Sequence, residues 1–244
     1  MTSEILFDQT PEKVELTNGE IHIFCASLDP PRPQLEQFAE TLSKDERQRA
    51  ARFYFEKDKA RFVAGRGILR EILGWLLEAG PRELVFSRES RGKPQLAGPA
   101  AGGFLHFNLA HCDSLAIYAV SRAHEVGVDL ERIRPIFETE EIVAHCFSDR
   151  ERAQWLSLPG DSRGEAFFNC WTRKEALLKA TGEGIGERMD QTEAFFAGDL
   201  SGGTRWWLQS LVPALDYTAA VAAECRDASL HCWKWQGEMR ADRA

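Results

Sequence analysis

The 244-residue sequence contains no apolar run long enough to span a membrane, and its beginning lacks the basic region and apolar core of a signal peptide. We therefore expect a soluble, cytoplasmic protein. Basic side chains are also in deficit, because 30 Lys and Arg stand against 38 Asp and Glu and give a net charge of −8. This balance argues against a general nucleic-acid binder and against a polybasic protein of the membrane surface.

Paired cysteines are lacking as well. The six cysteines are scattered without a CxxC pair, so the sequence indicates neither a disulfide framework nor a zinc ribbon. Three of them, at positions 112, 146 and 232, follow a histidine, but the ligand spacing of a known zinc or Cys/His catalytic site is absent. We expect reduced cysteines that act as small buried hydrophobes.

The first half of the chain predicts strands and a long helical region. Ser43 and Glu46 have the spacing of a capping box, so a helix begins there, and apolar residues at helical spacing continue it to about residue 77. A Pro-rich stretch at 29–33 ends the strand before it. Strands are expected at residues 21–26, 83–87, 104–108 and 115–120.

The second half repeats this order. Ser148 and Glu151 form another capping box, a helix covers about 165–180, and strands are expected at residues 206–211, 217–222 and 230–235. Matching signals lie at nearly constant separation: Ser43 with Ser148, Arg66 with Lys174, and Gly74 with Gly182. The sequence therefore predicts an α+β pseudo-dimer of two similar lobes, residues 1–122 and 123–244, each a helix packed on a small antiparallel sheet. The alternative is a chance likeness of two helix-plus-meander lobes.

Two carboxylates follow the predicted lobe junction. In a strand at 126–131, Asp129 and Glu131 project to one side while Val128 and Leu130 point into the core. Like charges this close repel unless a cation lies between them, and a hard ion such as Mg²⁺ suits oxygen ligands. The alternative is a strand whose acidic side faces water.

The second long helix carries a further acid. Trp171, Glu175 and Lys179 are spaced i, i+4, i+8 and share one side of it. Apolar residues cover most of the remaining helix surface, which favours a functional pair inserted into a core. An ordinary, partly exposed Glu–Lys pair is the other interpretation.

Basic residues elsewhere suggest an anionic ligand. Lys93 lies in a Gly-Lys-Pro turn, His111 ends a strand near the lobe junction, and Arg61 belongs to a basic set on the first long helix. Each alone is a weak signal, because such turns, histidines and arginines are usually structural or solvated.

Four segments together resemble, in order and spacing, the motifs of the surfactin-synthetase-activating (Sfp-like) 4′-phosphopantetheinyl transferases: residues 92–94, 107–112, 126–131 and 171–179. The resemblance spans most of the chain. It implies a two-lobed pseudo-dimer, expected as a monomer, that binds coenzyme A between its lobes. It also implies transfer of the phosphopantetheine arm to a serine of an apo acyl or peptidyl carrier protein, with release of 3′,5′-ADP.

The resemblance also implies roles for individual residues. Asp129, Glu131 and Glu175 match the acids that bind Mg²⁺, and Lys179 matches the lysine at the coenzyme A pyrophosphate. The remaining matches concern the nucleotide end and its 3′-phosphate: Lys93, His111 and, more loosely, Arg61. We expect Glu175 to take the serine proton and Lys179 to stabilise the departing phosphate.

One departure bears on this interpretation. The family usually has Ser-His-Ser where this chain has Ala110, His111 and Cys112, so a hydrogen bond to the 3′-phosphate is expected to be missing. Weaker phosphate binding would follow, by about tenfold to a hundredfold. Two alternatives stay open: a non-catalytic module that binds coenzyme A or a nucleotide, and a Mg²⁺-dependent phosphohydrolase.

Overall fold

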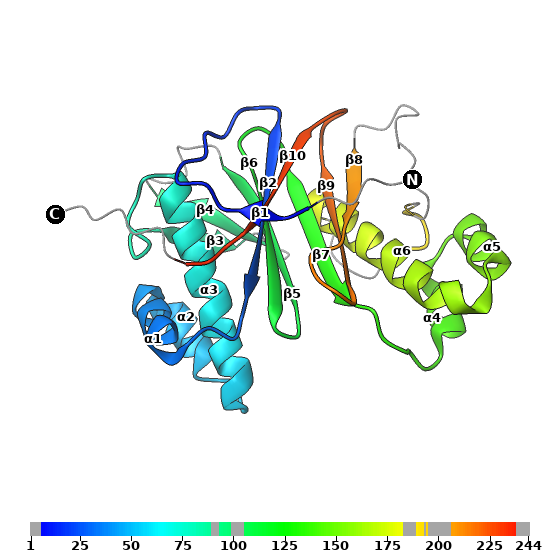
Figure 1. The fold of residues 1–244 in the computed structure, drawn as a ribbon, viewed down its shortest axis with the longest axis horizontal. Helices are drawn as coiled ribbons and strands as arrows, with labels where there is room; N and C mark the ends of the chain where they lie inside the picture. Colours follow the sequence, from blue (N-terminus) through cyan, green and yellow to red (C-terminus); the bar gives the residue numbers. More distant parts are fainter. Residues whose placement is uncertain are drawn as a thin grey trace.

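The computed structural model describes residues 6–88, 93–98, 105–182, 189–192, 194 and 206–237. Within these ranges the chain forms four layers in the order helix, sheet, sheet, helix (Figure 1). The α+β class expected from the sequence is confirmed. No helix of the described chain is long and apolar enough to cross a membrane.

The first sheet has the strand order β1-β10-β2-β6-β5. Its members are β1 (Asp8–Gln9), β2 (Glu20–Ser27), β5 (His106–Cys112), β6 (Leu115–Ser121) and β10 (Ser229–Lys234). The strands β2, β6 and β5 are antiparallel neighbours, whereas β10 runs parallel to both β1 and β2. The long helix α3 (Glu56–Leu76) covers the outer face, with α1 (Arg32–Thr41) packed against it and α2 (Lys44–Ala50) beside it.

The second sheet is smaller, with the order β7-β9-β8, and all of its neighbours are antiparallel. Its strands are β7 (Val126–Arg132), β8 (Trp207–Leu211) and β9 (Tyr217–Ala223). Helix α6 (Gly160–Thr181) covers its outer face, while α4 (Thr139–Cys146) and α5 (Asp149–Ser157) lie at the far end of the molecule (Figure 1). Helix α6 ends at Gly182, whose φ of 71° is a left-handed conformation that glycine adopts at low cost.

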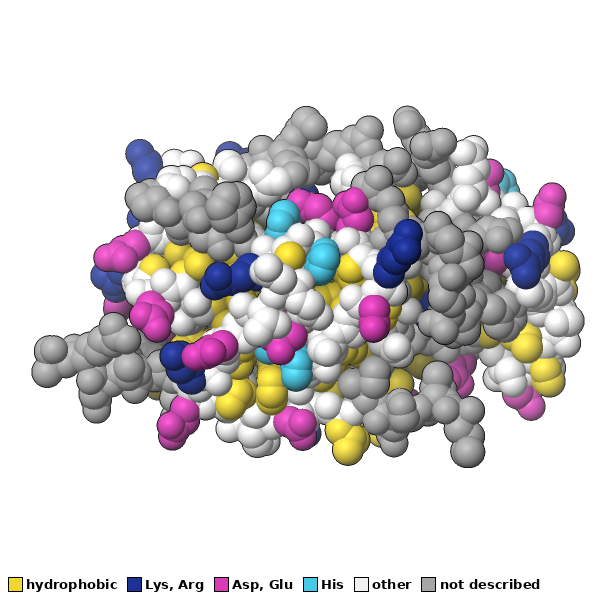
Figure 2. Space-filling model, turned by 90° about the horizontal axis from the view of Figure 1, so that it is seen from above, with side chains coloured by type: hydrophobic (Ala, Val, Ile, Leu, Met, Phe, Trp, Pro, Cys, Tyr) yellow, Lys and Arg dark blue, Asp and Glu magenta, His cyan; other side chains and the backbone are white. Residues whose placement is uncertain are grey.

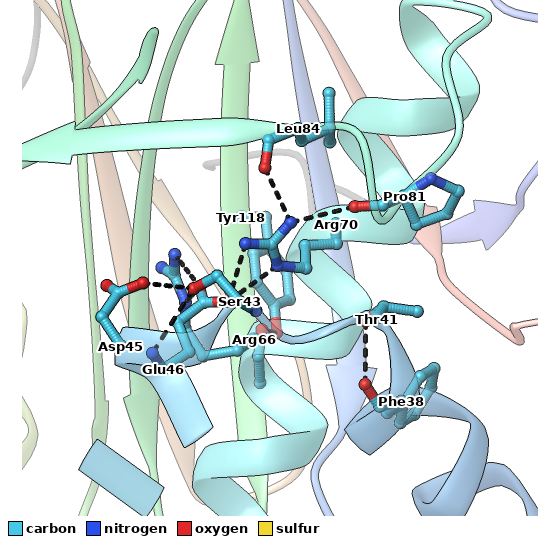
Figure 3. Close-up of polar contacts among 11 residues, drawn as sticks. Phe38, Thr41, Ser43, Asp45, Glu46, Arg66, Arg70, Pro81, Leu84 and Tyr118 are labelled. Atoms are coloured by element: carbon cyan, nitrogen blue, oxygen red, sulfur yellow. Dashed lines mark hydrogen bonds and ion pairs between the residues drawn. The ribbon is translucent and has the colours of Figure 1, made fainter. Parts of the chain in front are cut away.

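Both predicted capping boxes are confirmed, and each is tied to the long helix that follows it. The Glu46 carboxylate accepts hydrogen bonds from Arg66 and Arg70 of α3, and Arg70 also donates to the backbone carbonyl groups of Pro81 and Leu84 (Figure 3). In the second lobe, Glu151 pairs with Lys174 of α6. The predicted correspondence of Arg66 and Lys174 is therefore matched by their contacts, which supports duplication.

The C-terminal strand leaves the second lobe. The segment predicted at 230–235 forms β10, which pairs with β2 of the first sheet, His231 opposite His22. Parallel pairing of β10 with β2 ties the chain end to the other lobe. The lobe boundary between residues 122 and 123 stays a prediction, and β10 shows that backbone hydrogen bonds cross it.

Local elements differ from the prediction in several places, one of which is the unpredicted helix α4. Helix α1 begins within the Pro-rich stretch, at Arg32, because Pro31 and Pro33 flank this first residue and a proline in the first turn needs no intrahelical N–H bond. The predicted first helix is divided into α2 and α3 by residues 51–55. The segment after Lys93 forms the strand β4 (Pro94–Ala97), paired with β3 (Val85–Arg88).

The core between the sheets is apolar and fully closed. Ile21, Ile23 and Ile117 of the first sheet meet Val126 and Val128 of the second, each at 0% exposure. Since side chains alternate along β7, this packing turns the intervening residues of β7 toward α6. The inter-sheet core thus fixes which side of β7 can carry a functional group.

Candidate functional site

The carboxylates of β7 face α6, as the alternation of the sequence predicts. Val128 and Leu130 are buried between the sheets, while Asp129 and Glu131 point to the other side. Asp129 is 6% exposed and Glu131 is half-buried. Glu175 is 3% exposed on α6, the helix packed on this strand. Strand and helix therefore bring acids that are 44 or more residues apart in the sequence to one interface.

Close approach of α6 to β7 depends on Gly127. A Cβ added at this position would lie 2.1 Å from the carbonyl oxygen of Ala176 and 2.4 Å from the backbone nitrogen of Ala180. Backbone atoms cannot move aside as a flexible side chain can, so any side chain here would push the helix away. Gly127 is thus required for Glu175 to lie near Asp129, a role that sequence reasoning missed.

Lys179 contacts the acid of the strand directly. Its Nζ donates to Asp129 Oδ1 at 2.6 Å and to the carbonyl oxygen of Val128 at 3.3 Å. The Lys179 side chain is 26% exposed and that of Asp129 is 9% exposed, so the ammonium lies between the buried carboxylate and solvent. Lys179 is one turn beyond Glu175 and lies on the same helix face.

The negative charges of Asp129, Glu131 and Glu175 are only partly balanced by positive charge from the described residues. Burial, followed by the negative charges of Asp129 and Glu131, raises the pKa of Glu175 to about 7, and Lys179 opposes this shift. Burial also raises the pKa of Asp129, and burial with the Asp129 charge raises that of Glu131. These couplings require that the three carboxylates lie within electrostatic range of one another. Within the described part of the chain, the Lys179 ammonium is the cation that contacts one of these acids, Asp129, and one positive charge does not balance three carboxylates.

The donor set fits a hard divalent cation. Asp129 Oδ2 and Glu175 Oε2 are buried and have no hydrogen-bond partner among the described residues. An orphaned buried carboxylate oxygen is costly, and Mg²⁺ is bound in proteins by one or two carboxylates together with phosphate oxygens and water. The residues that would hold such an ion are Asp129, Glu131 and Glu175. Their carboxylates would have to draw closer together to do so, because among the described residues these acids do not form a closely spaced group of three ligands.

His111 and Arg61 lie near this site but have different surroundings. His111 is exposed at the end of β5, and partial burial of its ring, with the charges of Lys179 and Arg61, lowers its pKa. Arg61 forms a two-pronged ion pair with Asp29, with both N–O distances at 2.8 Å. The positive charges of Lys179 and Arg61 both act on His111, and each of them is paired with an aspartate, so an anion bound here would compete with Asp129 or Asp29.

Lys93 belongs to another group of residues. Its Nζ lies 2.8 Å from Glu125 Oε2, and His106 Nδ1 lies 2.8 Å from Glu125 Oε1. The hydrogen bonds from His106 and Lys93 lower the pKa of Glu125 to about 2. His106 and His111 are at opposite ends of β5, about 17 Å apart along the strand. Lys93 and His111 can hold one ligand only if it is extended. Gly92 of the predicted turn lies outside the described residues.

Two further residues connect β5 to the acid strand. Asn108 Oδ1 accepts the backbone N–H of Val128 at 3.1 Å, and Cys112 Sγ lies 3.7 Å from Glu131 Oε2. Asn108 is 6% exposed. A buried asparagine within an apolar strand is the signal that could have found this contact in the sequence.

A cluster in the first lobe meets the spacing of a metal site but has a structural role. Ligand atoms of Glu20, His22 and His231 all lie within 4.8 Å of one another. Trp233 Nε1 donates to His22 Nδ1 at 3.0 Å, so the neutral ring carries its proton on Nε2, which faces Glu20. The two imidazole rings are also stacked at 18°, so their in-plane lone pairs do not converge on one point. We assign this cluster to the β2–β10 junction.

Comparison with known families covers both lobes. The family model described as "4′-phosphopantetheinyl transferase, N-terminal" matches residues 26–123. The model of the 4′-phosphopantetheinyl transferase superfamily matches residues 125–221, which contain β7 and α6. A relative from Nostoc sp., "4′-phosphopantetheinyl transferase HetI", is 42% identical over 216 residues, 87% of this chain and 91% of the relative.

The chain belongs to the 4′-phosphopantetheinyl transferase superfamily. It is therefore a transferase. Other relatives are psf-1 of Bacillus pumilus, 34% identical over 67% of this chain and 70% of the relative, and Sfp of Bacillus subtilis, 28% identical over 69% and 73%. The resemblance seen in the four sequence motifs is confirmed.

A groove opens beside the acids of this phosphopantetheinyl transferase. It has a volume of about 380 Å³, and its lining includes Glu131, Arg134, Phe137 and Trp171. Phe137 is 92% exposed in the connection between β7 and α4. On the face shown in Figure 2, basic and acidic side chains of the described residues are interspersed and form no extended basic surface. The groove thus combines Arg134 with apolar side chains of the β7–α4 connection and of α6, beside Glu131.

Proposed function

We propose that this protein transfers the 4′-phosphopantetheine arm of coenzyme A to a serine of an apo acyl or peptidyl carrier protein. The proposal is carried by two buried carboxylate oxygens that have no hydrogen-bond partner among the described residues, Asp129 Oδ2 and Glu175 Oε2, together with the contact between Lys179 and Asp129. A site with excess negative charge that keeps a lysine is suited to a metal-bound pyrophosphate. Coenzyme A supplies such a pyrophosphate.

In the proposed reaction the serine Oγ forms a bond to the β-phosphorus of coenzyme A, and the pyrophosphate P–O bond breaks to release 3′,5′-ADP. Glu175 takes the serine proton. Burial and the neighbouring acids raise its pKa to about 7 in the metal-free site. A bound cation would lower this pKa and keep the carboxylate ionised, so that it can accept the proton. Lys179 binds the departing phosphate and stabilises the charge that develops there. Mg²⁺, when held by Asp129, Glu131 and Glu175, supplies neutralisation of the pyrophosphate charge.

The nucleotide end of coenzyme A is proposed to lie over β5. His111 with the nearby charges of Arg61 and Lys179 provides an anion-binding end, and Lys93 lies at the far end of the strand. A molecule as extended as coenzyme A suits a separation of about 17 Å along the strand. Arg61 would bind a phosphate group either after its ion pair with Asp29 opens or while that ion pair is kept.

The absence of a serine at position 110 should weaken phosphate binding less than the sequence predicts. Ala110 is 6% exposed and packs in the core between the sheets. Neighbouring residues of a strand point to opposite sides, so its side chain faces away from His111. A hydroxyl here would lie in the inter-sheet core, which removes the main support for a non-catalytic coenzyme A module.

We further propose that the carrier protein docks at the groove beside Glu131. Carrier proteins of this family are typically acidic, and Arg134 with the exposed Phe137 offers a charge and an apolar contact. Phe137→Ser should raise the KM for the carrier and leave coenzyme A affinity unchanged. Equal KM values for the variant and the wild type would place the docking surface elsewhere.

One experiment tests the function itself. The purified protein is incubated with Mg²⁺, coenzyme A and each of a panel of apo-carriers, and the intact mass of each carrier is measured. A gain of one phosphopantetheine is expected for at least one carrier. Coenzyme A binding without any mass gain would favour a binding module. Release of phosphopantetheine or phosphate without an acceptor would favour a phosphohydrolase.

A further inference from the structure

Lys179 is held by the acid it would have to leave in order to bind a substrate phosphate. Its Nζ lies 2.6 Å from Asp129 Oδ1, on the carboxylate whose other oxygen is buried and unpartnered among the described residues. A divalent cation bound by Asp129 would therefore lie beside an ammonium group. Two cations at that separation repel, so they compete for the same carboxylate.

The lysine can move farther than the acids. The backbones of Asp129 and Glu175 are held by β7 and α6, which approach closely at Gly127. The Lys179 side chain is 26% exposed and has a flexible four-carbon stem, so its ammonium can turn toward solvent without movement of the helix. Its second contact, the carbonyl oxygen of Val128, is long at 3.3 Å.

We propose that Lys179 is a displaceable internal counter-ion: a divalent cation takes its place at Asp129, and the released ammonium binds an anionic phosphate of the donor substrate. This inference rests on the proposed function for the identity of that donor. Because the cation frees the group that binds phosphate, metal and phosphate binding are positively coupled. By linkage, each ligand raises the affinity for the other by the same factor.

The first test measures Mn²⁺ affinity by electron paramagnetic resonance, without phosphate or coenzyme A. Lys179→Met keeps the length of the side chain and removes its charge, so this variant should bind Mn²⁺ at least about tenfold more tightly than the wild type. Arg134→Met is the matched control. It removes an exposed charge that acts on Glu131 but does not contact Asp129. A change below about threefold is expected there.

If Lys179→Met and Arg134→Met change Mn²⁺ affinity by the same factor, the effect is general electrostatics and the proposal is wrong.

A second measurement needs no variant. Wild-type protein is labelled briefly with acetic anhydride, and acetylation of Lys179 is quantified by mass spectrometry against Lys59, an exposed lysine of α3. Mn²⁺ alone should raise the labelling of Lys179, and Mn²⁺ with pyrophosphate should lower it again.

Unchanged or reduced labelling of Lys179 on addition of Mn²⁺ would overturn the exchange. The result is distinguishable from failure of the proposed function. Transfer to a carrier without any exchange at Lys179 would contradict this inference alone. Exchange at Lys179 without transfer to any carrier would contradict the proposed function and leave the exchange standing.

Discussion

Two buried clusters of charge differ in how completely their carboxylates are compensated. Glu46 has two arginines, Arg66 and Arg70, at both of its oxygens and also accepts the N–H of Ser43. Burial raises its pKa, but these partners outweigh burial and the net shift is downward. At the acid site three carboxylates share one contacting lysine, and their pKa values are raised. The carboxylate of the first cluster is fully paired, whereas the acids of the second are where we propose that a cation binds.

A comparison of corresponding positions in the two lobes makes this difference in charge compensation clearer. Arg66 and Lys174 are 108 residues apart (174 − 66), and the same separation places Gly67 opposite Glu175 (175 − 67). A Cβ at Gly67 would lie 2.3 Å from the Phe38 side chain of α1. The first lobe therefore uses this helix position to admit another helix, and the second lobe uses it to carry an acid.

The largest effect is expected from Glu175→Gln. Loss of the proton acceptor should lower transfer to the carrier by about 10²–10⁴-fold, with the fold preserved. Activity is measured by the gain in carrier mass with time, and circular dichroism checks the fold. A variant with wild-type activity would show that the under-compensated acid is not part of the reaction.

Arg70→Met breaks the fully paired cluster of Glu46. It removes one of two cations at a buried carboxylate and leaves Pro81 and Leu84 carbonyl groups without their donor. We expect a loss of about 3–5 kcal/mol in the free energy of unfolding, measured with urea. The exposed pair of Arg82 and Glu40 is the control, and Arg82→Met should cost at most about 1 kcal/mol. Similar losses for both variants would contradict the contrast.

Gly127→Ala and Gly67→Ala compare the two lobes directly. Each adds a methyl group to a close contact and should destabilise the protein by about 1–3 kcal/mol. Only Gly127→Ala separates α6 from β7, so it alone should reduce Mn²⁺ affinity and transfer at a temperature where both variants are folded. If Gly67→Ala impairs Mn²⁺ binding equally, the effect of Gly127 is not local.

The smallest effect concerns His22 in the first lobe. Burial, with the nearby His231, lowers its pKa to about 4, against an ordinary value near 6.5, while Glu20 opposes the shift. The unfolded chain then binds the proton at this histidine first, so the contribution of His22 to stability falls as pH drops below about 6.5. Between pH 7 and pH 5 this loss is about 2 kcal/mol.

The His22 contribution is absent in His22→Gln, so the change in free energy of unfolding between pH 7 and pH 5 should differ between the variant and the wild type by about 2 kcal/mol, as measured by urea denaturation. Glu175, whose pKa is raised to about 7, changes stability in the opposite direction in both proteins, so only this difference reports on His22. Transfer activity at pH 7 should be unchanged, because this cluster compensates its own charges. An identical pH dependence in both proteins would show that another group controls it.

Much of the fold follows from local rules. Both capping boxes, the alternation around Asp129 and the stop at Gly182 depend on spacings of a few residues, and all are found in the structure. Helix α1 was missed because a Pro-rich stretch was read as a break, although proline also suits the first turn of a helix. The family was recognisable from four motifs in order.

The sequence by itself determined which acids share a strand side and which residues share a helix face, because periods of 2 and 3.6 residues are local properties of the backbone. Only the tertiary structure decided that α6 reaches β7 at Gly127, that Lys179 pairs with Asp129, and that β10 crosses to the first sheet. These contacts join residues 49 or more positions apart. They depend on shape and charge balance, which no short pattern contains.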